Sequence, residues 1–367
     1  MVQQKTAGIA IVGTVGVPAN YGGFETLVEN LVRYHQDKNI NQPLTVYCST
    51  KAYSQRPATY MQAALKYIPL HANGVQSIPF DIWSLFSAIR NRSSGILILG
   101  VSGCVCLPLM RRLSSARIIT NIDGIEWRRD KWGSFAKWFL KFSEKLAVRY
   151  SDVVIADNQA IADYVTREYG KNCDVIAYGG DHALATLADP FSFPQLPSDY
   201  ALALCRIEPE NNVAMILDAW TRLNRPLVFV GNWNKSDYGR TLHEKYAGID
   251  HIHLLNPVYN AGALRAIRDR ASLYVHGHSA GGTNPSLVEM MHFGIPVVAH
   301  DCNFNRFSTE NRARYFLNAD ALVQKVNGLD SAQGAQIGAS MKIIAETRYT
   351  WARIGQQYFG LFQEAAS

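Results

Sequence analysis

The sequence lacks an apolar run long enough to cross a bilayer. The run ILILGVSGCVCLPLM at residues 96–110 is shorter than the roughly 20 residues that a spanning helix needs, and glycines and a proline interrupt it. Near the amino terminus, AGIAIVGTVGVPA (7–19) is preceded by little positive charge and leads directly into a glycine pair and an amphipathic pattern. This arrangement indicates a first strand and its loop rather than a signal peptide. We therefore predict no transmembrane segment.

Paired cysteines and clustered metal ligands are missing as well. The 6 cysteines are scattered, and none forms a C-x-x-C pair or a His/Cys metal spacing. No carboxylate cluster resembles a D-x-D metal site. We expect reduced thiols, as in a cytosolic protein, and neither an essential metal ion nor another cofactor.

Charge is sparse and only mildly biased. Charged residues make up 18% of the chain and hydrophobic residues 48%, which indicates a folded protein with sizeable cores. The net charge of +6 suits an anionic ligand, nucleic acid or an anionic membrane surface. No recognisable nucleic-acid-binding module is present, so we predict no nucleic-acid partner.

Short apolar segments alternate with helical patterns along the whole chain. Segments this apolar are typical of strands buried on both faces, in parallel sheets flanked by helices. The predicted strands are 8–13, 44–48, 96–100, 116–120, 152–156 and 174–178, then 200–204, 227–231, 251–255, 272–276 and 296–300.

The proline-rich segment DPFSFPQLPSD (189–199) separates the two sets of strands and is typical of a linker. The sequence therefore predicts two tandem doubly wound, Rossmann-like α/β domains, 1–190 and 191–345, and a carboxyl-terminal helix, 346–367. Ligands of such domains bind beyond the carboxyl ends of the strands. We expect the site in a cleft between the two domains.

The loop after the first predicted strand, GTVGVPANYGG (13–23), is longer than the G-x-G-x-x-G fingerprint of dinucleotide-binding proteins. No acidic residue ends the second predicted strand, where such proteins hold a ribose. Both observations argue against a nicotinamide enzyme. The apolar spacing of the following segment predicts a helix that packs on a sheet.

The stretch HGHSAGGTNPSLVE (276–289) follows a predicted strand and opens a predicted helix, 287–293. Thr283 or Asn284 suits the cap, Pro285 the first turn, and Gly294 the stop. Backbone N–H groups at such a helix start attract anions. Glu289, about one turn in, is placed to accept hydrogen bonds from sugar hydroxyls. The alternative is an ordinary well-capped turn.

Arg206, in CRIEPENNV (205–213), follows the first predicted strand of the second domain. A guanidinium there suits a bidentate clamp on phosphate. The alternative is a surface salt bridge to Glu208 or Glu210.

Taken in order, these motifs resemble glycosyltransferase family 4, with its two-domain GT-B architecture. CRIEPENNV resembles that family's G-R-x-x-x-E-K-N motif, and HIHLLNPVYNAGALRAIRDRASLYVHGHS (251–279) its nucleotide-base segment. TWARIGQQYFGLF (350–362) resembles the helix that crosses back to the first domain. GTVGVPANYGGFETLVENLV, NIDGIEWRRDKW and GGTNPSLVEMM resemble the bacterial rhamnosyltransferase subgroup, which builds capsule, O-antigen and other surface polysaccharides.

The resemblance implies a retaining transferase with dTDP-L-rhamnose as donor and a lipid-diphosphate-linked saccharide as acceptor. The residues it implies for the donor are Gly22, Gly23, Arg206, Asn211, Val258, Tyr259, Gly282, Thr283, Asn284, Pro285, Ser286 and Glu289. On the acceptor side it implies Glu25, Glu126 and Trp127. We assign catalysis to Arg206, Glu289 and Asp123, with Asp123 and Glu126 as the candidate bases.

Three positions depart from the family pattern. The family's first donor-site glutamate is replaced by Gly281, and the lysine that partners the arginine by Asn211. Asp123 stands where many relatives place a histidine near the donor's C6 hydroxyl, which is compatible with a 6-deoxy sugar.

The segment 127–150 combines aromatic and basic residues. Phe135, Trp138, Phe139, Phe142 and Leu146 form one predicted helical stripe, and Lys137, Lys141, Lys145 and Arg149 another. Such a helix is typical of an interfacial membrane anchor. We predict that Lys137, Lys141 and Lys145 contact an anionic membrane, at the cytoplasmic face. The alternative is a helix packed on its own sheet with a solvated basic face.

Two other functions fit the same motifs. One is a nucleotide-sugar epimerase or hydrolase of similar build, and the other a non-catalytic nucleotide-sugar-binding protein, which Gly281 and Asn211 make conceivable.

Overall fold

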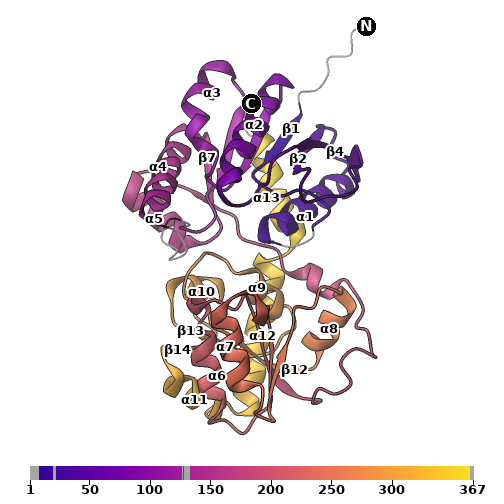
Figure 1. Ribbon diagram of the computed structural model, residues 1–367, viewed down its shortest axis with the longest axis vertical. Helices are drawn as coiled ribbons and strands as arrows, with labels where there is room; N and C mark the ends of the chain where they lie inside the picture. Colours follow the sequence, from indigo (N-terminus) through magenta and orange to yellow (C-terminus); the bar gives the residue numbers. More distant parts are fainter. Residues whose placement is uncertain (1–7, 20–21, 126, 128–132, 364–367) are drawn as a thin grey trace. The chain divides into compact units, whose positions relative to one another are not determined.

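The computed structural model describes residues 8–19, 22–125, 127 and 133–363. The chain divides into two compact units: residues 1–177 with 351–367, and residues 178–350 (Figure 1). Among the helices within these described residues, none combines the length and the apolar composition that crossing a membrane requires.

The first unit is built on an 8-stranded sheet with the order β3-β4-β2-β1-β5-β6-β7-β8. All neighbouring strands are parallel except β3 and β4. The strands are β1 (Ile9–Val12), β2 (Leu44–Ser49), β3 (Thr59–Tyr60), β4 (Ala63–Ile68), β5 (Gly95–Leu99), β6 (Arg117–Asn121), β7 (Val153–Ala156) and β8 (Asp174–Val175).

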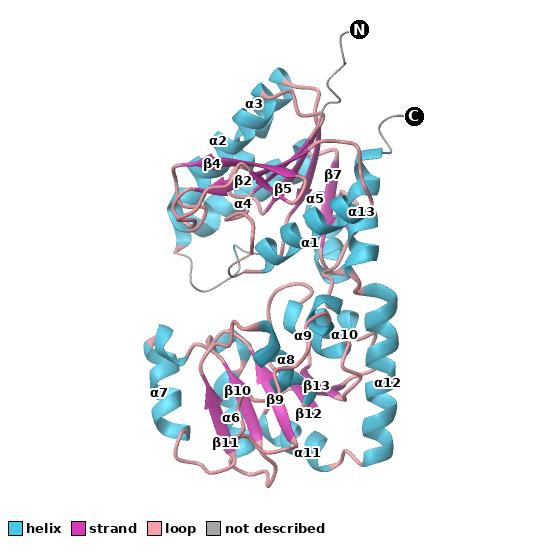
Figure 2. Ribbon diagram, turned by 90° about the vertical axis from the view of Figure 1, so that its right-hand side faces the viewer, coloured by secondary structure: helices cyan, strands magenta, loops and turns pink. Residues whose placement is uncertain are grey.

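Helices cover both faces of this sheet (Figure 2). They are α1 (Gly23–Asp37), α2 (Ser77–Arg90), α3 (Leu107–Leu113), α4 (Ser134–Tyr150), α5 (Gln159–Tyr169) and α13 (Trp351–Gln363), with short 3-10 helices η1 (Gly74–Gln76) and η2 (Cys104–Cys106). α1 buries Leu27, Val28, Leu31 and Val32, which confirms its predicted apolar face.

The carboxyl-terminal helix α13 belongs to the first unit. The rings of Tyr34 on α1 and Phe359 on α13 stack with their centroids 5.8 Å apart. The side-chain amide of buried Asn121, at the end of β6, donates to the hydroxyl of Tyr358 over 2.7 Å. These contacts fix the helix to both α1 and the sheet.

The second unit is built on a 6-stranded parallel sheet with the order β11-β10-β9-β12-β13-β14. Its strands are β9 (Tyr200–Leu204), β10 (Leu227–Val230), β11 (Ile252–Leu255), β12 (Ala271–His276), β13 (Val297–His300) and β14 (Arg314–Phe316).

The helices of the second unit are α6 (Val213–Trp220), α7 (Asp237–Tyr246), α8 (Ala261–Asp269), α9 (Pro285–Met291), α10 (Asn303–Ser308), α11 (Ala319–Asn327) and α12 (Ser331–Arg348). Its 3-10 helices are η4 (Asp181–Leu184), η5 (Pro209–Asn211) and η6 (Trp233–Lys235). The core includes Trp220, Phe229 and Trp233. The two buried indole N–H groups donate to backbone carbonyls, so the core leaves neither donor unpaired.

Strand order locates the crevice of each sheet. In the second sheet the chain builds outward from β9 to β11 and then returns to β12 on the other side of β9. The point between β9 and β12 is therefore the topological switch point, where ligands of such sheets bind. In the first sheet the equivalent point lies between β1 and β5.

The predicted fold, two Rossmann-like domains with parallel sheets, is confirmed, but three strands were not predicted. β4 carries the half-buried Lys66 and Tyr67 among its apolar residues, and it lies beside the short edge strand β3. β14 is an edge strand of three residues. Conversely, the predicted strand 174–178 is reduced to Asp174–Val175.

The boundary between the units also differs from the one predicted at residue 190. The compact units divide after Ala177 and again before Trp351. The proline-rich segment belongs to the second unit, because the N–H of Asp189 donates to the carbonyl of Gly262 over 3.0 Å and Arg270 donates to the carbonyl of Phe193 over 3.1 Å.

Candidate active site

Two carboxylates on α1 hold the glycine-rich loop that follows β1. Glu25 accepts hydrogen bonds from the N–H of Val15 over 2.9 Å and from the hydroxyl of Thr14 over 3.2 Å. Glu29, one turn later, accepts from the N–H of Ala19 over 2.9 Å. The loop is therefore held by its own helix. Glu25 is buried, so its observed contacts are with the loop, and contact with an acceptor stays a prediction.

Gly22 caps α1 with a backbone that only glycine adopts easily, and Gly23 begins the helix. The φ angle of Gly22 is 128°, and a Cβ there would lie 1.9 Å from Oε2 of Glu25. A side chain at this position would displace the carboxylate that holds the loop.

We expect Gly22→Ala to lower the free energy of unfolding by about 1–3 kcal/mol, because the residue would be strained and Glu25 displaced. Thermal unfolding of the full chain measures the loss. Gly133→Ala is the matched control, since that position has ordinary φ and no atom within 4 Å of an added Cβ. Equal midpoints for the two variants would contradict the steric argument.

Asp123 lies just beyond β6 in a left-handed backbone conformation, with φ of 59°. Its N–H donates to Oδ1 of Asn121 over 2.8 Å, and the same asparagine donates to Tyr358 on α13. The backbone of the predicted base is thus fixed to the sheet and to the carboxyl-terminal helix. Glu126, the other candidate base, lies outside the described residues.

Trp127 is held by a buried carboxylate that the sequence pattern alone does not single out. Its indole N–H donates to the hydroxyl of Tyr164 over 3.3 Å, and that hydroxyl donates to Glu144 over 2.7 Å. Tyr169 donates to Glu144 as well, over 2.6 Å. Burial raises the pKa of Glu144 above its ordinary value. The signal in the sequence is a glutamate on the apolar face of an amphipathic helix.

In the second unit, Arg206 follows β9 at the switch point. Its guanidinium lies 3.7 Å from Glu208, and 41% of its side chain is exposed. An exposed pair at this distance leaves the guanidinium accessible. The geometry is therefore compatible with both interpretations of Arg206, a clamp on phosphate and a surface salt bridge. Asn211 is buried, and its amide donates to the carbonyl of Arg206 over 2.7 Å. Asn211 thus stabilises the turn that carries Arg206.

The stretch 276–289 forms the predicted turn and helix. Asn284 is the N-cap, and its side chain accepts from the N–H of Ser286 over 3.1 Å and from its hydroxyl over 2.8 Å. Pro285 occupies the first helical position, as predicted. The helix α9 begins two residues before the predicted start and ends at Met291. Thr283 is buried, and around Gly281 no atom lies within 4 Å of a would-be Cβ.

Glu289 is held in a buried charge cluster within the second unit. One carboxylate oxygen pairs with Arg268 of α8, and the other lies 3.4 Å from His182 of η4. Only 6% of the Arg268 side chain and 12% of the Glu289 side chain are exposed. Burial opposes ionisation, but Arg268 and His182 outweigh it and keep the pKa of Glu289 below its ordinary value.

Arg268 was not predicted. The signal in the sequence is an arginine on the buried face of the helix AGALRAIRD, where an apolar residue is usual. Its partner Glu289 was predicted to contact the donor sugar. The structure gives this carboxylate two protein partners, and contact with a sugar stays a prediction.

The two ends of the second unit meet at α9. The N–H of Gly180 donates to the carbonyl of Tyr349 over 2.7 Å, and the same carbonyl lies 3.0 Å from a ring nitrogen of His292. A Cβ on Gly180 would lie 2.8 Å from the backbone nitrogen of Glu289. Both passages of the chain out of this unit therefore start from residues packed on α9.

Two histidines at the end of β12 were also not singled out. The rings of His276 and His278 stack with centroids 4.4 Å apart, and the hydroxyl of Tyr274 lies 3.4 Å from Nδ1 of His276. Burial lowers the pKa of His276 well below its ordinary value, so this ring is neutral at neutral pH. The sequence signal is the pair of histidines around Gly277 at a strand end.

Val258 and Tyr259 lie in the connection between β11 and α8. Val258 is half-buried, whereas 71% of Tyr259 is exposed. Exposure of a tyrosine ring is compatible with its predicted place beside a nucleotide base. Gly282 lies in the turn before α9.

The predicted membrane-contact residues of α4 differ in exposure. Lys141 pairs with Glu168 of α5 over 2.9 Å, and its ammonium lies 4.8 Å from the ring centroid of Trp127. Lys137 is half-buried, and Lys145 is exposed. The Lys141 side chain is 44% exposed despite this pair, and contact of the three lysines with a membrane stays a prediction.

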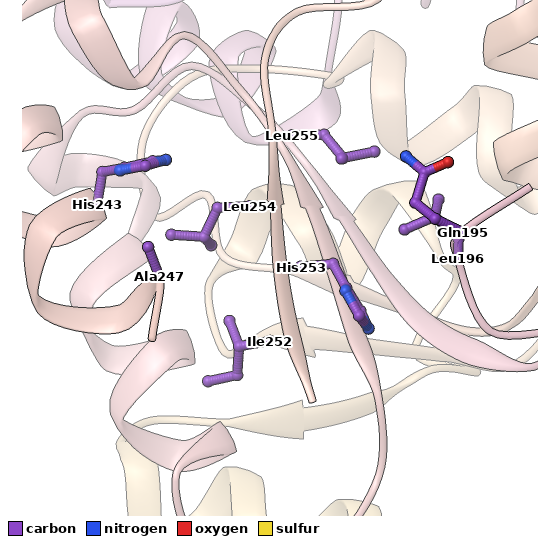
Figure 3. A pocket seen from close by; sticks show the side chains of 8 residues that line it. All are labelled: Gln195, Leu196, His243, Ala247, Ile252, His253, Leu254 and Leu255. Atoms are coloured by element: carbon purple, nitrogen blue, oxygen red, sulfur yellow. The ribbon is translucent and has the colours of Figure 1, made fainter. Parts of the chain in front are cut away.

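A hollow of about 230 Å³ lies beside the edge strand β11 (Figure 3). Gln195 and Leu196, from the segment before β9, and His243 and Ala247, from α7, line it together with β11. None of the predicted site residues lines this hollow. Within the part of the chain that the structure describes, no group of three or more His, Cys, Asp or Glu residues is arranged to hold a metal ion.

Two family models match the chain, one in each half. Residues 6–181 match a domain of unknown function, DUF1972. Residues 191–327 match glycosyl transferases group 1. No curated protein matches the chain in sequence.

Similar solved structures cover nearly the whole chain. Sucrose-phosphate synthase from Thermosynechococcus elongatus has a TM-score of 0.80 at 16% identity, over 98% of this chain and 100% of that one. The Anabaena protein HepE in complex with UDP has a TM-score of 0.73 at 16% identity, over 97% and 100%.

The catalytic domain of starch synthase IV from Arabidopsis thaliana, bound to ADP and acarbose, has a TM-score of 0.73 at 14% identity, over 98% and 99%. At these identities the likeness establishes the fold, which is the GT-B fold of two Rossmann-like domains. The protein therefore has the GT-B fold and carries a glycosyl transferases group 1 domain at residues 191–327.

Proposed function

We propose that this protein is a retaining glycosyltransferase that moves L-rhamnose from dTDP-L-rhamnose to a lipid-diphosphate-linked saccharide in the synthesis of a bacterial surface polysaccharide. The observation that carries the proposal is the accessible guanidinium of Arg206 at the switch point of a glycosyl transferases group 1 domain. Ligands of parallel α/β sheets bind at that point, and a guanidinium there suits a diphosphate.

The solved relatives support a nucleotide-sugar donor. HepE is described in complex with UDP, with UDP and glucose, and with UDP-glucose, and starch synthase IV is bound to ADP. We propose that this chain likewise binds a donor that carries a nucleoside diphosphate. The choice of rhamnose and of a thymidine nucleotide rests on sequence resemblance to rhamnosyltransferases. The resemblance lies in the glycine-rich loop, the 121–132 segment and the 281–291 segment.

Glycosyl transfer breaks the bond between the anomeric carbon and the diphosphate oxygen, and a new bond forms to the acceptor oxygen. Negative charge grows on the departing diphosphate. Arg206 and the backbone N–H groups of Gly282, Thr283 and Asn284 stabilise that charge, and Glu289 orients the sugar nucleotide. The acceptor hydroxyl loses its proton as it attacks from the face that the diphosphate leaves. Asp123 is the candidate that accepts this proton.

A panel of nucleotide sugars, offered with a synthetic lipid-diphosphate saccharide and read by mass spectrometry, tests the proposal. We expect a product heavier by one deoxyhexose, formed from dTDP-L-rhamnose only when the acceptor is present. A chelator leaves the rate unchanged, because no metal is assigned a role.

Each other result contradicts the proposal in a distinct way. Hydrolysis or epimerisation of the donor without acceptor identifies an epimerase or hydrolase. Saturable binding of dTDP-L-rhamnose without turnover, with every acceptor offered, identifies a non-catalytic binding protein. Transfer of a different sugar refutes rhamnose as the donor sugar, but the assignment as a glycosyltransferase stands.

We also propose that the protein acts on the cytoplasmic face of the plasma membrane, as a peripheral protein. The support is the lipid-linked acceptor implied by the resemblance, and the net charge of +6.

A further inference from the structure

α4 has a packed face and an exposed face on opposite sides. Its buried residues, Leu140, Ser143, Glu144, Ala147 and Val148, repeat at i, i+3, i+4, i+7 and i+8. That spacing keeps one face of a 3.6-residue helix on the sheet. Figure 1 shows α4 in the first unit with α3 and α5 nearby.

The opposite face carries three aromatic rings in contact with one another. Phe135 is 77% exposed, Trp138 62% and Phe142 44%. The ring centroids are 5.9 Å apart between Phe135 and Trp138 and 5.8 Å apart between Trp138 and Phe142, where the rings are nearly parallel. Three adjoining exposed aromatic rings are unusual on a surface that faces only water.

The same face continues into basic residues. Lys145 and Arg149 follow Phe142 at i+3 and i+7, and both are exposed. The one acidic residue of α4, Glu144, is buried on the other side. No negative charge on this helix therefore opposes an anionic surface.

We propose that the exposed face of α4, defined by Phe135, Trp138, Phe142, Lys145 and Arg149, docks on an anionic lipid bilayer. The three rings enter the boundary between headgroups and acyl chains, and the two cations contact lipid phosphates. Rings that are exposed, adjoining and followed along the same helix face by Lys145 and Arg149 complement such a surface in both polarity and charge. Lys137 is left out because it is half-buried, and Lys141 because it pairs with Glu168 and lies over the ring of Trp127.

This surface refines the membrane location proposed above, and its test needs no donor or acceptor. The full chain is mixed with vesicles of phosphatidylcholine or of equimolar phosphatidylcholine and phosphatidylglycerol, and bound protein is measured by flotation. We expect Lys145→Glu with Arg149→Glu to lower partitioning to the anionic vesicles by about thirty-fold or more. Phe135→Ser, Trp138→Ser and Phe142→Ser together lower it by at least about tenfold.

Matched controls lie in the second unit. Phe191→Ser removes a ring that is 86% exposed. Arg312→Glu with Lys325→Glu reverses two exposed charges there. We expect wild-type binding from both, and equal losses in the control and α4 variants would overturn the proposal, since net charge and hydrophobicity alone would then explain binding.

Lipids brominated in their acyl chains report insertion directly. Trp138→Phe keeps an apolar ring, so it binds as the wild type does but loses much of the fluorescence quenching that the bromine causes. Quenching equal to that of the wild type would overturn insertion of this ring.

Two further measurements separate this proposal from its alternatives. If the aromatic variant abolishes self-association of lipid-free protein and leaves vesicle binding intact, the face is an interface between copies, and the proposal fails. If vesicle binding fails but transfer to a water-soluble acceptor proceeds, the surface is wrong and the proposed reaction stands. If vesicle binding is normal but no transfer occurs, the surface stands and the proposed reaction is wrong.

Discussion

Replacing Arg206 by alanine lowers kcat/KM for the nucleotide sugar by about 10²–10³, the usual cost of removing one group that stabilises charge on a departing oxygen. The side chain is 41% exposed, and its pair with Glu208 is 3.7 Å long. An exposed pair of this kind contributes little to stability. We therefore expect the variant to fold normally and its loss of activity to arise in the chemical step.

Arg222→Ala is the matched control for this experiment. That arginine is 42% exposed, lies in the same unit and pairs with Asp320 over 2.6 Å. We expect wild-type kinetics from it. Unchanged kcat/KM in Arg206→Ala would mean that the guanidinium only forms a surface ion pair, and the assignment of the leaving-group site would fail.

Replacing Arg268 by methionine lowers the free energy of unfolding of the second unit by about 3–5 kcal/mol, because Glu289 is left charged and buried with one weak partner. Calorimetry of the full chain measures the change. Adding Glu289→Gln to this variant removes the uncompensated charge, so we expect the double variant to recover part of the stability. If Arg268→Met alone is as stable as the wild type, the two side chains do not form the buried pair.

The same pair gives a pH dependence of known sign. The pKa of Glu289 is lowered in the folded state, so the folded protein holds this proton more weakly than the unfolded chain does. The contribution of the ionised Glu289 to the free energy of unfolding is complete above the ordinary glutamate pKa of about 4.3. It disappears as the pH falls through the lower pKa that Glu289 has in the folded protein. We expect the stability gap between wild type and Glu289→Gln to be constant near neutrality and to close in acid.

Much of the architecture follows from the sequence, because strands buried on both faces are continuous apolar runs. β1, β5 and β9 are such runs, and their order along the chain predicts two Rossmann-like domains. β4 and β14 were missed because strands near an edge need not be apolar throughout. The unit boundary was misplaced because prolines mark an irregular segment, and only the bonds from Asp189 and Arg270 assign that segment to the second unit.

The candidate site was predictable where local chemistry decides it. Asn284 and Pro285 carry the capping signal of α9 in their own side chains. The partners of Glu289 were not predictable, since Arg268 and His182 are 21 and 107 positions away in the chain, and only tertiary packing brings them to one carboxylate. Likewise, Lys141 belongs to a basic pattern in the sequence, but its neighbour Glu168 lies on another helix.

The bond between Gly180 and Tyr349 has a consequence for communication within the molecule. These residues lie next to the only two points where the backbone passes from one unit to the other, and both are packed on α9. The two connections thus start from residues that are hydrogen-bonded to each other and packed against the helix that bears Glu289. A substitution that displaces this helix is therefore expected to disturb both connections together rather than one of them.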